Sequence, residues 1–115
     1  MPSFPENPTE LFEFLKSTKC TVIKFSASWC GPCKNVKFLK NYGNLKKEYE
    51  KDVIFWEFDV DENTNLIEET KLYNFNISAV PTIKIFHYSK QLNEYKGASY
   101  LTNVKTDIET IINNL

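Results

Sequence analysis

The sequence has almost no excess charge, no long apolar run and only three cysteines, and each shortage excludes a class of protein. The formal net charge of −1 argues against a nucleic-acid-binding protein, because such proteins usually carry a basic face. No apolar run reaches the length that spans a membrane. The opening MPSFPENPTE lacks the basic and then apolar segments of a secretory signal. We therefore expect a cytoplasmic protein that binds neither nucleic acid nor a membrane.

The cysteines are too few, and odd in number, for the disulfide framework of a small secreted domain. Cys30 and Cys33 form a CxxC pair within the stretch KFSASWCGPCK. In a reducing compartment such a pair is typical of a catalytic or a metal-binding site. A closed zinc site needs four ligands, and the spare candidates are Cys20 and His87, of which Cys20 begins its strand at the far end. We therefore favour redox chemistry and expect no metal site.

The length and the regular patterning predict one domain over residues 1–115. The chain has 115 residues, 42% of them apolar and 15% aromatic, which suffices for a single core. Apolar periodicity and turn signals predict helices over 7–17, 33–49, 63–75 and 100–115, and strands over 20–28, 52–61, 82–88 and 92–97. Asn7 and Thr102 are the predicted N-caps of the first and last helices.

The order of these elements predicts the fold class. The first two strands flank a helix, so we expect them to be parallel, whereas the last two are close enough to form an antiparallel hairpin. We therefore predict an α/β protein with a central mixed β-sheet and helices on both faces.

Two cysteines at positions i and i+3 of one helical turn can form a disulfide and reopen it without large backbone movement. We place Cys30 at the start of the helix, where free N–H groups and the helix dipole favour a thiolate and lower the thiol pKa. Cys30 is then the nucleophile that attacks a substrate disulfide, and Cys33 is the resolving thiol. Pro32 suits the first helical turn, while Trp29 and Gly31 leave an apolar, open lip.

Four motifs together resemble the thioredoxin family. They are WCGPC at 29–33, DVD at 59–61, SAVPTIKIF at 78–86 and KGA at 96–98. The resemblance implies the thioredoxin fold and a protein-disulfide reductase, or dithiol electron carrier, that acts as a monomer on client proteins with disulfides. It also implies no bound cofactor, because a thioredoxin reductase-like enzyme would supply electrons from NADPH.

The resemblance also implies a substrate-binding groove around Cys30. By position its members are Trp29, Gly31, Pro32, Val80, Pro81, Gly97 and Ala98. Pro81 would follow a cis peptide bond and lie opposite the cysteines, and Val80 would present its backbone N–H and C=O to a bound client.

Two charged positions depart from the family pattern. Lys24 stands where the family usually has a buried aspartate, and Glu57 where some members have a lysine. We predict a reversed Lys24–Glu57 pair across adjacent strands that affects the charge or the proton of Cys33. The alternative is that Lys24 extends to the surface without a chemical role. In addition, Phe38 replaces a proline that usually kinks the second helix.

Two other functions remain open. The same fold could serve a thiol oxidase or disulfide isomerase, or a non-catalytic adaptor. Pro32, where an isomerase would have histidine, and the lack of a signal favour reduction. Lys24 favours the opposite direction, since a cation near the sulfurs stabilises the reduced thiolate.

Overall fold

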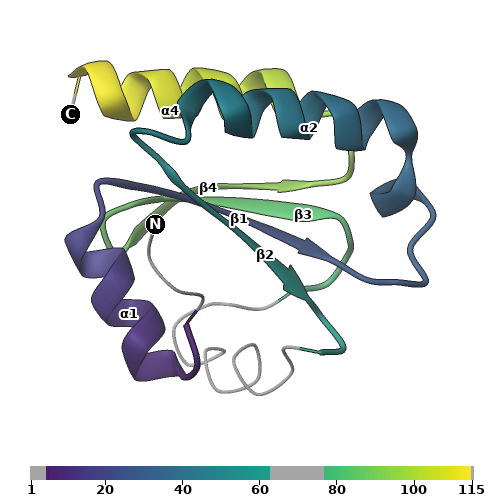
Figure 1. The fold of residues 1–115 in the computed structure, drawn as a ribbon, viewed down its shortest axis with the longest axis horizontal. Coiled ribbons are helices and arrows are strands. Elements are labelled where there is room, and N and C mark those ends of the chain that lie inside the picture. The colour runs from purple at the N-terminus through teal and green to yellow at the C-terminus, as the bar shows by residue number, and fades with distance from the viewer. Residues whose placement is uncertain (1–4, 63–76, 115) are drawn as a thin grey trace.

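A computed structural model describes residues 5–62 and 77–114. The helix predicted over 63–75 lies outside these residues. The elements in chain order are α1 (Pro8–Ser17), β1 (Cys20–Ser26), the 3-10 helix η1 (Pro32–Lys34), α2 (Val36–Tyr49), β2 (Ile54–Asp59), β3 (Thr82–His87), β4 (Lys90–Lys96) and α4 (Leu101–Asn114) (Figure 1).

The sheet is mixed, as predicted, with the strand order β2-β1-β3-β4. Strand β1 pairs in parallel with β2, placing Lys24 opposite Glu57, and pairs antiparallel with β3, placing Phe25 opposite Thr82. Strands β3 and β4 form the predicted antiparallel hairpin. The ends of β1 and β2 and the beginning of β3 therefore lie at one edge of the sheet.

Helices cover both faces of this sheet. Helices α2 and α4 pack on one face, and α1 packs on the other (Figure 1). Side chains alternate along β1, so that Cys20 and Val22 join the core under α2 and α4, while Ile23 and Phe25 join the core beside α1. The same alternation directs Lys24 towards α2.

The first helix begins as its sequence predicts. The Asn7 side chain accepts a hydrogen bond of 2.8 Å from the Glu10 N–H, and Pro8 occupies the first helical position, where no donor is needed.

The predictions for the other two helix starts are wrong. The helix expected from Cys33 is divided: η1 ends at Lys34, Asn35 is extended at ψ 126°, and α2 begins at Val36. Asn35 caps α2 by accepting a 3.0 Å hydrogen bond from the Phe38 N–H. Thr102 lies inside α4, not before it, because the helical hydrogen bonds already include Val104 N–H to Tyr100 C=O at 3.0 Å.

Among the described helices, none combines the length and the apolar character of a membrane-spanning segment.

The packing of α4 on the sheet leads to a prediction about stability. Ile108 is fully buried in the core formed by α2, α4 and the sheet. We expect Ile108→Ala to lower the free energy of unfolding by about 2–5 kcal/mol, through lost burial and the remaining cavity. Val36→Ala, at a position 79% exposed, should change it by less than about 0.5 kcal/mol. Urea denaturation measures the free energy of unfolding of both variants. Equal losses would contradict the burial of Ile108 in this core.

Candidate active site

The connection between β1 and α2 holds both cysteines of the predicted pair. Cys30 and Cys33 form a disulfide, with Cα atoms 5.3 Å apart. Cys30 is 3% exposed and Cys33 is 5% exposed. The neighbouring Trp29 is 68% exposed, and Gly31 and Pro32 are also exposed. The sulfurs are thus sheltered beside an open, partly apolar lip of the kind that a partner chain can contact.

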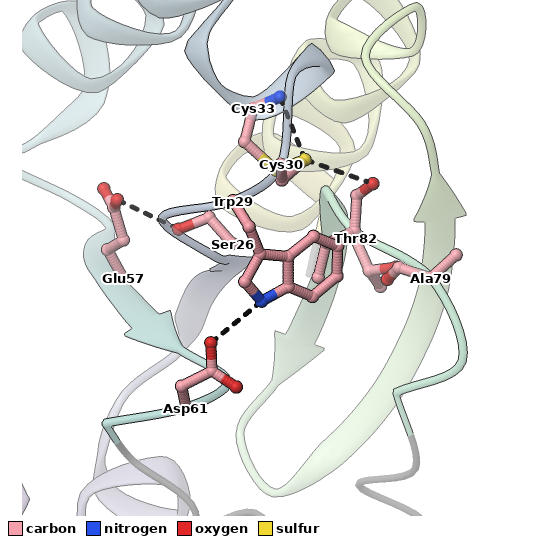
Figure 2. The surroundings of a disulfide bond; sticks show 9 residues. Ser26, Trp29, Cys30, Cys33, Glu57, Asp61, Ala79 and Thr82 are labelled. Carbon is pink, nitrogen blue, oxygen red and sulfur yellow. Dashed lines mark hydrogen bonds between the residues drawn. A yellow bond between two sulfur atoms is a disulfide. The ribbon is translucent and has the colours of Figure 1, made fainter.

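The Sγ atom of Cys30 lies between two backbone groups. The Cys33 N–H donates to it over 3.1 Å, and the Val80 carbonyl oxygen is 3.5 Å away (Figure 2). A disulfide sulfur carries no proton, so the second contact becomes a hydrogen bond only when Cys30 is a thiol. The Cys33 N–H stabilises negative charge on Cys30 in the reduced form.

Of the two predicted causes of thiolate stabilisation, the free N–H group is present, but the first turn of a long helix is not. Cys30 precedes the 3-10 helix η1 and not the long helix α2, so it does not lie at the first turn of an α-helix. The N–H groups of Lys34 and Asn35 are already bonded to Gly31 and Pro32. The free N–H of Cys33 is therefore what contacts the sulfur.

The chain before β3 forms the opposite wall of the site. The Val80–Pro81 peptide bond is cis, as the resemblance implies. Val80 packs against the small cluster of Ala27, Cys30 and Cys33. The Gly97 N–H donates to the Pro81 carbonyl over 2.7 Å, and Gly97 has φ +110°, which favours glycine.

The structure thus brings most of the predicted groove together. Trp29, Gly31 and Pro32 flank the cysteines in sequence, Val80 contacts their cluster, and the Pro81 hydrogen bond joins Gly97 to the same wall. Ala98 lies further out, packed against the core under α2 and α4.

One hydrogen bond at this edge was missed by the sequence analysis. The Trp29 Nε1–H donates to Asp61 Oδ2 over 2.9 Å (Figure 2). Asp59 in turn accepts hydrogen bonds from the N–H groups of Asp61 and Glu62, at 2.8 and 3.0 Å. The predicted parallel pairing of β1 and β2 could have indicated that Trp29 and Asp61 lie close together, because parallel strands end at the same edge of a sheet.

Lys24 and Glu57 form the predicted ion pair. Lys24 Nζ lies 3.1 Å from Glu57 Oε2. Ser26 Oγ donates to Glu57 Oε1 over 3.2 Å (Figure 2). Lys24 is only 3% exposed, so it does not extend to the surface, and its ammonium lies 4.4 Å from the Tyr42 ring centroid and 5.6 Å from that of Phe38. Phe38 thus occupies the space above this lysine.

The pair is unequal in its exposure to water. The Glu57 side chain is 57% exposed while that of Lys24 is buried, so the carboxylate keeps much of its hydration and the ammonium does not. Aromatic faces and the carboxylate replace the water that Lys24 loses. Burial, and next the charge of Glu57, also raise the pKa of the neighbouring Tyr42 hydroxyl.

No group of three or more His, Cys, Asp or Glu side chains suited to a metal occurs within 5–62 and 77–114. Cys20 and His87 face each other across β1 and β3, at the end of β1 opposite to the disulfide. They therefore do not join the CxxC pair in one site.

The thioredoxin family model matches residues 4–110. The chain belongs to the thioredoxin family. It is 38% identical to thioredoxin from Geodia cydonium over 102 residues, which cover 86% of this chain and 89% of that protein. It is 34% identical to thioredoxin from Homo sapiens over 97 residues, which cover 84% and 80% of the two chains.

Solved thioredoxin structures have the same fold. Oxidised thioredoxin from Plasmodium falciparum aligns with a TM-score of 0.68 and 27% identity, covering 87% of this chain and 90% of that one. Oxidised mitochondrial thioredoxin 3 from Saccharomyces cerevisiae aligns with a TM-score of 0.69 and 30% identity, covering 96% and 92%. The protein is therefore a thioredoxin-fold thiol–disulfide oxidoreductase, and its Cys30–Cys33 disulfide is the redox carrier.

The third cysteine of the chain differs sharply from the active pair. Cys20 is a free, fully buried thiol, and burial, then the charge of Asp107, raise its pKa to about 12. An unfolded cysteine ionises near pH 8.5, so this burial stabilises the fold below about pH 8.5 and its contribution falls as the pH rises towards 12.

We expect Cys20 to resist iodoacetamide at pH 8 in the reduced, folded protein, because its thiol is protonated and inaccessible. Mass spectrometry should find the label on Cys30 first, and on Cys20 only after unfolding in urea. Labelling of Cys20 in the folded protein at the rate of a free thiol would contradict its burial.

Proposed function

We propose that this protein is a protein-disulfide reductase. The contact that best supports the proposal is the 3.1 Å hydrogen bond from the Cys33 N–H to Cys30 Sγ, because it favours the thiolate that attacks. The Cys30 thiolate breaks a client S–S bond and forms a mixed disulfide, and the released client sulfur takes up a proton. The Cys33 thiolate then attacks Cys30, which restores the internal disulfide and releases the second client sulfur. Two electrons pass to the client in each cycle.

The proposed partners follow from this reaction. Client proteins would supply the disulfides, and an NADPH-dependent, thioredoxin reductase-like enzyme would return the internal disulfide to the dithiol. Such a protein would act as a monomer of one domain over residues 1–115, without a bound cofactor. It would work in the cytoplasm, in electron transport and cell redox homeostasis.

The client chain would lie in the groove around Cys30. Trp29, Gly31 and Pro32 would form one lip, and Val80, Pro81, Gly97 and Ala98 the other. The Val80 carbonyl, 3.5 Å from Cys30 Sγ, would accept a hydrogen bond from the client backbone at the reacting sulfur.

The main alternative is net oxidation or isomerisation of client thiols. The buried ammonium of Lys24, on the strand that leads to the cysteines, would favour it if its charge acts on the sulfurs, because a cation stabilises the reduced thiolate and makes the protein a weaker reductant. A non-catalytic adaptor is less favoured, because the disulfide is formed and its sulfurs adjoin an open lip.

An insulin-reduction assay tests the proposal directly. With dithiothreitol as electron source, the protein should accelerate precipitation of the insulin B chain, and Cys30→Ser should abolish the acceleration because no attacking thiolate remains. Cys33→Ser should instead trap a mixed disulfide with the client, visible by mass spectrometry. Equal turnover by Cys30→Ser and the native protein would contradict the proposal.

We also propose that Lys24 and Glu57 set the redox potential of the cysteine pair. Lys24→Met removes a cation and should make the potential more negative by about 30 mV, which is about tenfold in the equilibrium constant. Glu57→Gln should move the potential in the positive direction, and the double variant should lie near the native value. Equilibration with glutathione measures all three. If the potentials and the Cys33 alkylation rates across pH are all unchanged, Lys24 and Glu57 have only a structural role.

A further inference from the structure

The stretch of sequence that contains the active-site connection is rich in lysine and has no carboxylate. Residues 14–47 contain no aspartate or glutamate, but they contain eight lysines: Lys16, Lys19, Lys24, Lys34, Lys37, Lys40, Lys46 and Lys47. Because the whole chain has a net charge of −1, its negative charge lies in the remaining sequence. The near-neutral total therefore hides an excess of positive charge in this stretch of the sequence.

Three of these lysines follow the disulfide at intervals of three residues. Lys34 lies in η1, and Lys37 and Lys40 lie in the first half of α2, where this spacing places them on neighbouring positions of the helix surface. All three are exposed, and none has an ion-pair partner within 5–62 and 77–114. They leave positive charge available to a partner.

A hollow of about 540 Å³ lies between the first half of α2 and the start of α4. Asn35, Lys37, Phe38 and Asn41 line one side, and Ala98 and Thr102 line the other. Among the described residues no carboxylate lines it, and the polar side chains there are one ammonium, amides and hydroxyls. Ala98 joins this hollow to the proposed client groove.

The surface between α2 and α4 is chemically different at its other end, towards the end of α2. A second hollow between α2 and α4 is lined by Glu48 and Lys105, which form an ion pair of 3.4 Å with each other. Its cation already has a carboxylate partner. An anionic group from another molecule is therefore favoured more at the near end, beside Lys37, than at this far end.

We propose that the hollow at Lys37 accepts a glutamate or aspartate side chain of a client protein, close in sequence to the client's disulfide. The inference rests on the proposed reductase function and adds a substrate class to it: disulfides with acidic flanks. A client chain that leaves Cys30 along Gly97 and Ala98 reaches this hollow next, and its carboxylate meets Lys37 with Lys40 nearby.

A local acidic segment fits this surface better than a long polyanion such as nucleic acid. On the other side of the disulfide, Asp61 is bonded to Trp29, and Asp59 and Glu62 lie near it in the chain. These carboxylates repel a polyanion that extends across the site. The two signs of charge therefore also fix the direction in which a client lies.

Two synthetic peptides test the proposal. Each holds one intramolecular disulfide, flanked in one peptide by glutamates and in the other by glutamines of nearly equal size. We expect the reduced protein to reduce the glutamate peptide about fivefold faster at low salt, because opposite charges speed association. The ratio should approach one at about 1 M salt, where the screening length is about 3 Å.

Variants that remove lysine charges show which lysines cause the preference for the glutamate peptide. Lys37→Gln with Lys40→Gln should reduce the glutamate preference to less than about twofold, and the rate for the glutamine peptide should stay unchanged. The matched control is Lys51→Gln with Lys90→Gln, which removes the same charge at exposed positions beyond the other ends of α2 and β1. This control variant should keep the preference for the glutamate peptide.

A second pair of variants tests the hollow itself. Thr102→Glu places a carboxylate in its wall and should also remove the preference, whereas Thr110→Glu adds the same charge further along α4. Equal rates for the two peptides at low salt, or equal losses in the test and control variants, would overturn the acidic subsite while the reductase function stands. No reduction of either peptide would overturn both.

Discussion

The pairing of β1 with two different neighbours is the constraint on which the active site depends. Because β2 runs parallel to β1 and β3 runs antiparallel to it, the residues after β1, the residues after β2 and the residues before β3 meet at one edge of the sheet. Cys30, Asp61 and Val80 are far apart in sequence, and this edge brings them together. A one-residue shift of either pairing would also turn Lys24 away from α2 and into the apolar core beside α1.

Lys24 shows how one strand holds a buried charge within an apolar core. Its position in β1 is fully buried by α2, so the ammonium must find partners inside the protein, and it finds Glu57 across the parallel pair and the rings of Tyr42 and Phe38 above. Removing one member of a buried charge pair costs more than the pair itself contributes, because a desolvated charge is left behind. The Lys24→Met and Glu57→Gln variants therefore differ in kind, since only the second leaves the buried charge.

The sequence predicted the strands, the mixed sheet, the first N-cap and the two cysteines, because each depends on local periodicity or on a specific short motif. The same resemblance predicted the cis bond before Pro81 and the Lys24–Glu57 pair. The start of α2 at Val36 could not be predicted from apolar spacing, which continues from Cys33 through the break at Asn35. Thr102 is a good capping residue by type, but α4 begins one residue earlier. The Trp29–Asp61 bond and the hollow at Lys37 depend on tertiary placement, which periodicity does not contain.

The outer strand β4 has a consequence for how this protein behaves at high concentration. An edge strand exposes unpaired backbone groups that can template aggregation with another copy. Here β4 begins and ends with lysines, Lys90 and Lys96, and the pairing between β3 and β4 shifts register at Ile85 and Phe86. Charge at both ends and an irregular ladder oppose the addition of a further strand alongside β4.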